Sequence, residues 1–158
     1  LQNELTGFTP DKLTGMKNFP VMRALISEAE RCFAPAQIVP KRTTSDIEFL
    51  GHHIPANTLI MHLHVMSHFE ESRYPDPLVF NPQRWLDSDL DKANAFGGGK
   101  HMCLGMGVTR VYMPLTLALL YSQYDLALTG PPLSESLEPG FEPAPRSTVM
   151  QGKITLRS

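Results

Sequence analysis

The sequence predicts a mainly helical α+β fold, and three observations lead to that prediction. Apolar residues recur at helical spacing over residues 21–33 and again over 104–120. Residues 40–68 instead show short alternating runs, which are typical of strands. Proline accounts for 14 of 158 residues, about 9% against a usual ~5%, so much of the chain has to run as loops and extended connections.

The helix expected at 21–33 is amphipathic, with a proline just before it and another just after it. Its apolar positions are Val21, Leu25, Ala29, Cys32 and Phe33. The following alternating runs, 47–49 and 59–63, are separated by Gly51 and a turn at 55–57, which predicts a small antiparallel sheet.

His62 and His64 are two apart in this predicted sheet, so they would face the same way and could bind a metal ion. No third ligand lies at suitable spacing, and the alternative is a pair of partly buried sheet histidines.

The prolines at 75, 77 and 82 then exclude regular helix or central strand, so we expect an ordered meander there.

Four glycines surround Cys103 in residues 95–105, and glycine is used where a backbone needs positive φ or approaches a ligand closely. A buried, unreactive cysteine is the alternative interpretation. The helix expected over 104–120 is apolar on most faces, which predicts burial in a body larger than this chain, and it contains Pro114. Beyond a proline-rich loop at 131–145, residues 149–156 are expected to form a hairpin arm around Gly152.

Composition excludes several classes. The formal net charge is −2 and no run of five basic residues occurs, so nucleic acid is not an expected partner. Cys32 and Cys103 have no CxxC spacing, so neither a disulfide framework nor a structural zinc site is predicted. The apolar runs are shorter than the ~20 residues of a membrane span. We expect a soluble, cytoplasmic protein, with an upstream membrane anchor left open.

Residues 96–105, FGGGKHMCLG, resemble the haem-thiolate loop of the cytochrome P450 family, FxxGx[RH]xCxG. The motif positions are Phe96, Gly99, His101, Cys103 and Gly105. The resemblance implies haem b (iron protoporphyrin IX) as cofactor, with the Cys103 thiolate as the axial iron ligand. Phe96, Gly99 and Gly105 would then shape the cofactor site, and bulky replacements at Gly98 or Gly105 would disturb it.

Further segments match the family in order. Residues 28–31, EAER, fit its ExxR motif, and 81–85, NPQRW, resemble its meander motif. Together they imply a structural triad of Glu28, Arg31 and Arg84. Residues 68–77 also align with a stretch of the family that ends in an aromatic residue followed by Pro-Asp-Pro.

The resemblance also implies cofactor and substrate contacts. Arg42 and His101 would bind the haem propionates, although a surface arginine and a loop histidine are the alternative. Ala36, Gln37, Ile38 and Val39 would line a substrate pocket, with residues 148–151 as a second wall; ordinary core packing fits their apolar character equally well. Lys100 and Arg110 could steer an electron donor or be two solvated cations.

We therefore expect residues 1–158 to be a partial cytochrome P450 domain, the C-terminal section of that fold, without the distal oxygen-activating helix. The first residue is Leu1 rather than Met, which also favours a fragment. The implied function is monooxygenation of a small, apolar organic substrate with O2 and electrons from a ferredoxin or a flavoprotein reductase. No catalytic residue beyond Cys103 is predicted. A haem-thiolate isomerase or peroxygenase and a non-catalytic haem-binding remnant are the alternatives. The histidine in the cysteine loop favours a soluble, bacterial-type member.

Overall fold

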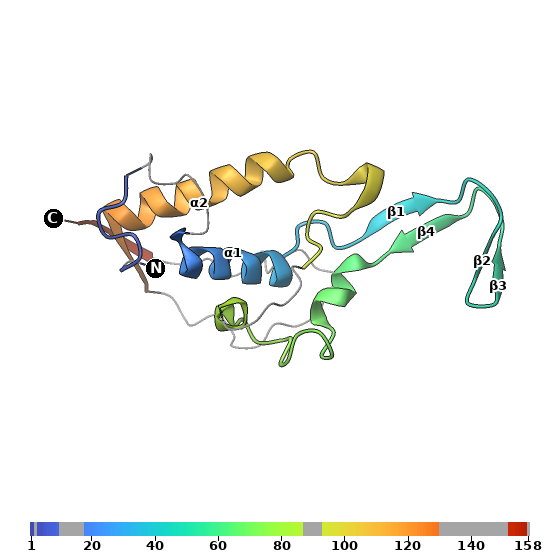
Figure 1. The fold of residues 1–158 in the computed structure, drawn as a ribbon, viewed down its shortest axis with the longest axis horizontal. Coiled ribbons are helices and arrows are strands. Elements are labelled where there is room, and N and C mark those ends of the chain that lie inside the picture. Colours follow the sequence, from blue (N-terminus) through green and yellow to red (C-terminus); the bar gives the residue numbers. More distant parts are fainter. Residues whose placement is uncertain (2, 10–17, 87–92, 130–151, 158) are drawn as a thin grey trace.

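The computed structural model describes residues 1, 3–9, 18–86, 93–129 and 152–157. Its helices are α1 (Pro20–Cys32), η3 (His64–Phe69), η4 (Pro82–Trp85), η5 (Gly99–His101) and α2 (Met106–Gln123), where η marks a 3-10 helix. Its strands are β1 (Val39–Arg42), β2 (Ile47–Phe49), β3 (His52–Ile54), β4 (Leu59–His62), β5 (Tyr124–Leu128) and β6 (Gly152–Leu156). Figure 1 shows α1 between α2 and the meander that contains η4, while a long hairpin projects from one end. The predicted mainly helical α+β fold is confirmed.

Helix α1 lies within one residue of its predicted bounds. It begins at Pro20, where the missing N–H costs nothing because the first-turn donors have no partner inside the helix. Glu4 accepts hydrogen bonds from the next two donors, the backbone N–H groups of Val21 at 2.9 Å and Met22 at 3.0 Å. The N-terminal segment therefore caps the helix, which the sequence analysis did not predict.

The long hairpin consists of two antiparallel ladders, β1 with β4 and β2 with β3. Leu50 and Gly51 connect β2 to β3 and both have positive φ, 50° and 78°, as a two-residue type I′ turn requires. The predicted antiparallel pairing is confirmed, but the strand ends at His62. His64 lies in η3, so the two histidines do not share a strand.

Strand β6 pairs antiparallel with β5, and Gly152 lies opposite Leu128. The expected C-terminal hairpin arm is present as β6, which begins at Gly152 and whose partner strand follows α2 directly. The sequence analysis missed β5, since no glycine or proline separates it from that helix. Residues 131–145 and 148–151 lie outside the described residues.

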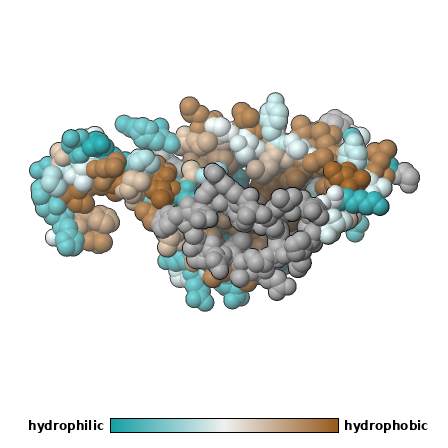
Figure 2. Space-filling view, turned by 180° about the vertical axis from the view of Figure 1, so that it is seen from behind, coloured by the Kyte–Doolittle hydropathy of each residue, from teal (hydrophilic) through white to brown (hydrophobic). Residues whose placement is uncertain are grey.

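Two small clusters form the core of the part of the chain that the structure describes. One contains Leu5, Phe19, Met22 and Ala118, and the other contains Ala24, Tyr74 and Trp85. Helix α2 is continuous through Pro114, but several of its apolar side chains are uncovered by the described residues: Val108, Val111 and Tyr112 are 57 to 65% exposed, and Leu104, just before the helix, is fully exposed. Figure 2 shows hydrophobic residues, in brown, along the upper edge of the molecule, where α2 lies. Among the described helices, none has the length and hydropathy needed to cross a membrane.

Candidate functional site

A cavity of about 580 Å³ lies between α1, the base of the long hairpin, the cysteine loop and α2. Of the ten residues that the resemblance assigns to the cofactor or the substrate pocket, five line it: Ala36, Val39, Phe96, His101 and Cys103. Gln37, Ile38, Gly99, Gly105 and Arg42 do not line it. The thiol of Cys103 is exposed, so the buried-cysteine alternative does not hold for this residue. The structure thus gathers a potential metal ligand and several predicted pocket residues around one space.

The cysteine loop is closed by backbone hydrogen bonds. The N–H of Cys103 donates to the carbonyl of Phe96 at 2.9 Å, and the carbonyl of Cys103 accepts from the N–H of Met106 at 3.2 Å. The guanidinium of Arg110 lies over the Phe96 ring, 5.6 Å from its centroid. Arg110 therefore packs on the loop and is not merely a solvated cation.

Positive φ occurs at Gly97 (69°) and Gly99 (66°), a backbone region that favours glycine. Gly98 and Gly105 instead have φ of −160° and −77°, which any residue adopts. A Cβ atom on Gly105 would contact the Cys103 sulfur at 3.6 Å, whereas one on Gly98 would meet nothing within 4 Å. Positive φ thus requires glycine at Gly97 and Gly99, whereas a bulky residue would meet the Cys103 sulfur at Gly105 and nothing nearby at Gly98.

The structure places Arg42 away from the cavity, and its role in binding a haem propionate stays a prediction. Its guanidinium donates to the carbonyl of Asn57 at 2.7 Å and to the Asn57 side-chain oxygen at 3.3 Å, on the exposed hairpin. Side chains alternate along a strand, so Arg42 faces away from the side of β1 that carries Val39 and Lys41. Those two residues line the cavity. Lys41 is therefore the cation of β1 that reaches the site, and counting alternate positions from Val39 could have found it.

His62 and His64 line the cavity beside Lys41, with ring centroids 6.0 Å apart. His64 is only 5% exposed, and within the described part of the chain neither of its ring nitrogens has a hydrogen-bond partner. Burial, with a smaller contribution from His62, lowers the pKa of His64, so its ring is neutral at pH 7. The described residues contain no group of three or more metal-ligating side chains, so the His62–His64 metal site gains no support.

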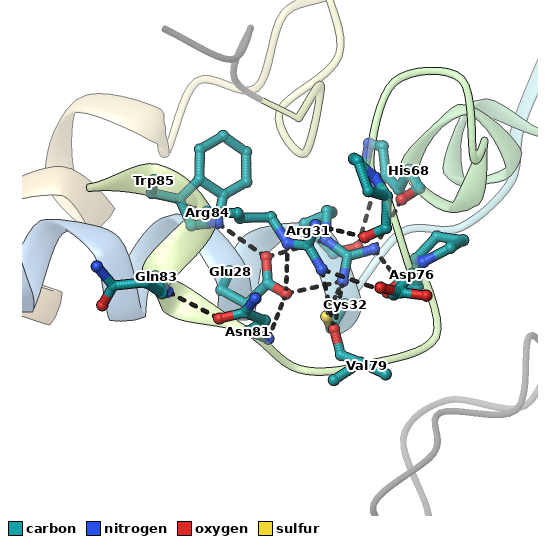
Figure 3. A network of polar contacts seen from close by, with 12 residues as sticks. Glu28, Arg31, Cys32, His68, Asp76, Val79, Asn81, Gln83, Arg84 and Trp85 are labelled. Carbon is teal, nitrogen blue, oxygen red and sulfur yellow. Dashed lines mark hydrogen bonds and ion pairs between the residues drawn. The ribbon is translucent and has the colours of Figure 1, made fainter. Parts of the chain in front are cut away.

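Beside this cavity lies a buried polar network centred on Glu28 (Figure 3). Arg31 donates to both Glu28 carboxylate oxygens, from Nε at 3.0 Å and from Nη2 at 2.8 Å. Arg84 donates from Nε to one of these oxygens, Oε1, at 3.2 Å. The structure therefore brings the three members of the predicted triad into direct contact.

Two further donors complete the shell of Glu28. The indole N–H of Trp85 donates at 2.8 Å and the backbone N–H of Asn81 donates at 2.8 Å. Burial by itself raises the pKa of Glu28, but the hydrogen bonds from Arg31, Asn81 and Trp85 outweigh it, so the pKa is lowered. The sequence analysis missed Trp85, although an aromatic residue with a donor directly after Arg84 is a signal that could have been used.

Arg31 connects the helix to the meander. Its guanidinium is fully buried and donates from Nη1 to the carbonyls of His68 at 2.8 Å and Pro77 at 2.7 Å. Arg84 reaches the same meander through the carbonyl of Pro75 at 2.7 Å. Arg31 also donates to the sulfur of Cys32 at 3.1 Å, and burial raises the pKa of that thiol to about 12. The network therefore fixes the meander against α1. The thiol of Cys32 stays protonated and uncharged, and it contributes to packing.

Comparison with known proteins identifies the family to which this chain belongs. The family model described as Cytochrome P450 matches residues 1–147. The chain belongs to the cytochrome P450 family. Members of that family carry haem, and the donor set of the cavity is consistent with such a cofactor.

Named relatives agree with this assignment. The chain is 32% identical to the cytochrome P450 monooxygenase hkm5 of Aspergillus hancockii over 90% of its own length, and 30% identical to corytuberine synthase of Coptis japonica over 86%. It spans 29% of each of these relatives. A solved structure, the retinoic acid bound cyanobacterial CYP120A1, superposes with a TM-score of 0.62 at 28% identity, covering 72% of this chain and 28% of that one. The chain therefore has a partial cytochrome P450 fold. Since the two relatives come from a fungus and a plant, the bacterial-type assignment stays a prediction.

Proposed function

We propose that this chain contributes the thiolate side of the haem site of a monooxygenase that inserts one atom of O2 into a small, apolar organic substrate. The observation that carries the proposal is the exposed Cys103 thiol on the wall of a cavity of about 580 Å³. Family membership and the monooxygenase among the relatives support it. Because the chain spans 29% of its curated relatives, the activity is proposed for the complete natural polypeptide.

The cavity fits haem b by the chemistry of its lining. A thiol lies on one side of the cavity, and imidazole rings and an ammonium group lie among apolar side chains. The buried ring nitrogens of His64 have no partner among the described residues, which is expected where a polar ligand completes the site. When bound, a haem with a thiolate ligand supplies the electron transfer and oxygen chemistry of the reaction.

Residues of this chain then have distinct tasks. Cys103 would ligate iron, and the hydrogen bond between its N–H and the Phe96 carbonyl holds the loop in shape. His101 would donate to a haem carboxylate at the cavity rim. Ala36 and Val39 contribute apolar surface that would exclude water from the substrate. The Glu28 network would act at a distance by fixing the meander, because none of Glu28, Arg31 and Arg84 lines the cavity.

The electron donor is proposed to be a ferredoxin or a flavoprotein reductase. Lys100 is exposed in the cysteine loop and is available to an acidic partner. Arg110 is also exposed, but it packs on the Phe96 ring, so its proposed contribution is to couple the docking surface to the loop.

The test is the ferrous carbon monoxide spectrum of the complete natural polypeptide and of its Cys103→Ser variant. Cys103→Ser should abolish the red-shifted Soret band that a thiolate ligand produces, whereas Cys32→Ser, a matched control away from the cavity, should retain it. Survival of the band in Cys103→Ser would overturn the ligand assignment.

A second measurement separates reaction classes. Substrate oxidation that requires both O2 and an electron donor supports monooxygenation. Turnover with hydrogen peroxide alone would favour a peroxygenase, rearrangement without any oxidant an isomerase, and haem binding without turnover a non-catalytic protein.

A further inference from the structure

Arg110 contacts the cysteine loop without lining the cavity. It belongs to α2 and is exposed, and the cavity-lining residues include its neighbour Thr109 but not Arg110 itself. Its guanidinium carbon lies over the Phe96 ring, 5.6 Å from the ring centroid. Phe96 does line the cavity. One residue therefore contacts both the cavity and a cation that lies outside it.

Phe96 is joined to Cys103 through the backbone. The N–H of Cys103 donates to the carbonyl of Phe96 at 2.9 Å, and the carbonyl of Cys103 accepts at 3.2 Å from the N–H of Met106, where α2 begins. The Phe96 residue, the proposed iron ligand and the helix that carries Arg110 thus form one hydrogen-bonded unit. Arg110 therefore keeps a defined position relative to the Cys103 sulfur, as groups around a metal ligand generally do.

No carboxylate of the described residues neutralises the charge of Arg110. None of the ion pairs found among those residues involves it. Lys100 of the same loop is a second cation. Because a guanidinium is not deprotonated in proteins, Arg110 places a permanent positive charge beside the cysteine loop.

We propose that Arg110 is a positioning residue whose charge, held on the Phe96 ring, favours the ferrous over the ferric form of the proposed haem-thiolate centre. The proposal rests on the proposed function and extends it to a residue outside the motif positions. The step that it affects is the addition of one electron to ferric iron, which comes from the ferredoxin or flavoprotein reductase of that function. The electron transfer itself forms and breaks no bond, and it makes the centre more negative by one charge. A nearby cation stabilises the more negative form.

The first measurement is the reduction potential of the complete natural polypeptide loaded with haem, titrated with dithionite in the absence of O2. Dithionite replaces the protein electron donor, so a role of Arg110 in docking cannot contribute to the result. Arg110→Met removes the charge and keeps an unbranched apolar stem. It should lower the ferrous-to-ferric ratio at a given potential about threefold, the scale of a cation–π contact at an exposed site. Threefold corresponds to about 30 mV, because a tenfold change is about 59 mV for one electron.

Three other substitutions separate the charge from packing. Arg110→Lys keeps the charge without the planar guanidinium and should retain most of the wild-type potential. Arg110→Glu reverses the charge and should lower the potential further than Arg110→Met does. Arg23→Met is the matched control, because Arg23 is an exposed arginine of α1 that does not line the cavity, and it should leave the potential unchanged.

Two further readouts exclude a merely structural effect. The ferrous carbon monoxide complex of each Arg110 variant should keep its red-shifted Soret band, and the far-ultraviolet circular dichroism should match the wild type. Raising the NaCl concentration from about 0.05 M to about 0.5 M should shrink the difference in potential between the wild type and Arg110→Met, because salt screens exposed charges.

The outcomes distinguish the role of Arg110 from the proposed function. If the wild type binds no haem or lacks the red-shifted band, the proposed function fails and the role of Arg110 fails with it. If the band is present but Arg110→Met and Arg110→Glu keep the wild-type potential, only the role of Arg110 is overturned. Equal shifts in Arg110→Lys and Arg110→Met would assign the effect to packing and overturn the role of the charge. An equal shift in Arg23→Met would assign the effect to the net charge of the protein and overturn the proposal as well.

Discussion

Replacing Glu28 with alanine tests the central network most directly. The carboxylate is fully buried and accepts hydrogen bonds from five donors on Arg31, Asn81, Arg84 and Trp85. Glu28→Ala would leave the equally buried Arg31 guanidinium without its counter-charge. Removing one partner of a buried ion pair costs about 3–5 kcal/mol, which is a large part of the ~5–15 kcal/mol that holds a folded domain. We therefore expect the meander to detach and most of the folded, haem-loaded protein to be lost.

The assay is urea unfolding of the complete natural polypeptide, together with its haem content after purification. Glu71→Ala is the matched control, because that glutamate is exposed in the meander and should change the free energy of unfolding by no more than about 0.5 kcal/mol. A Glu28→Ala variant that stays haem-loaded, with a free energy of unfolding within about 1 kcal/mol of the wild type, would refute the reasoning.

Three further predictions concern stability. Trp85→Phe removes the indole donor to Glu28 and should lower the free energy of unfolding by about 1.5–3 kcal/mol, less than Glu28→Ala; an unchanged urea midpoint would contradict it. Glu4→Ala removes the acceptor for two first-turn N–H groups of α1 and should cost about 1 kcal/mol, measured against Glu71→Ala. Acid should destabilise the fold in two stages. Burial lowers the pKa of His64 and His68, so their contribution is present above pH 6.5 and declines below it, by up to about 1.4 kcal/mol per pH unit for each. The lowered pKa of Glu28 adds a loss as the pH falls from its ordinary 4.5 through the folded value. Stability that is flat between pH 6.5 and pH 5 would contradict the histidine assignment, and the absence of a further loss below pH 4.5 would contradict the assignment for Glu28.

Local signals predicted the parts of the fold that depend on neighbours in the chain. Helix α1 follows from its three-and-four spacing and from Pro20, and the β2–β3 turn follows from Gly51. Strand β5 could not be predicted in this way, because its existence depends on pairing with β6, which lies 24 residues further along the chain. The Glu4 cap is similar, since a carboxylate 17 residues before the backbone N–H that donates to it leaves no local pattern.

The sequence by itself determined the family of this protein and the residue proposed to bind iron, because the motif around Cys103 is a contiguous run of specific residue types. Only the tertiary structure decided which cation reaches the cavity. Lys41 and Arg42 are adjacent and chemically similar, but the pleat of β1 sends one toward the site and the other away. It also decided that Trp85 and Asn81 complete the shell of Glu28, because a buried carboxylate must satisfy its oxygens with whatever donors the folded chain brings to it.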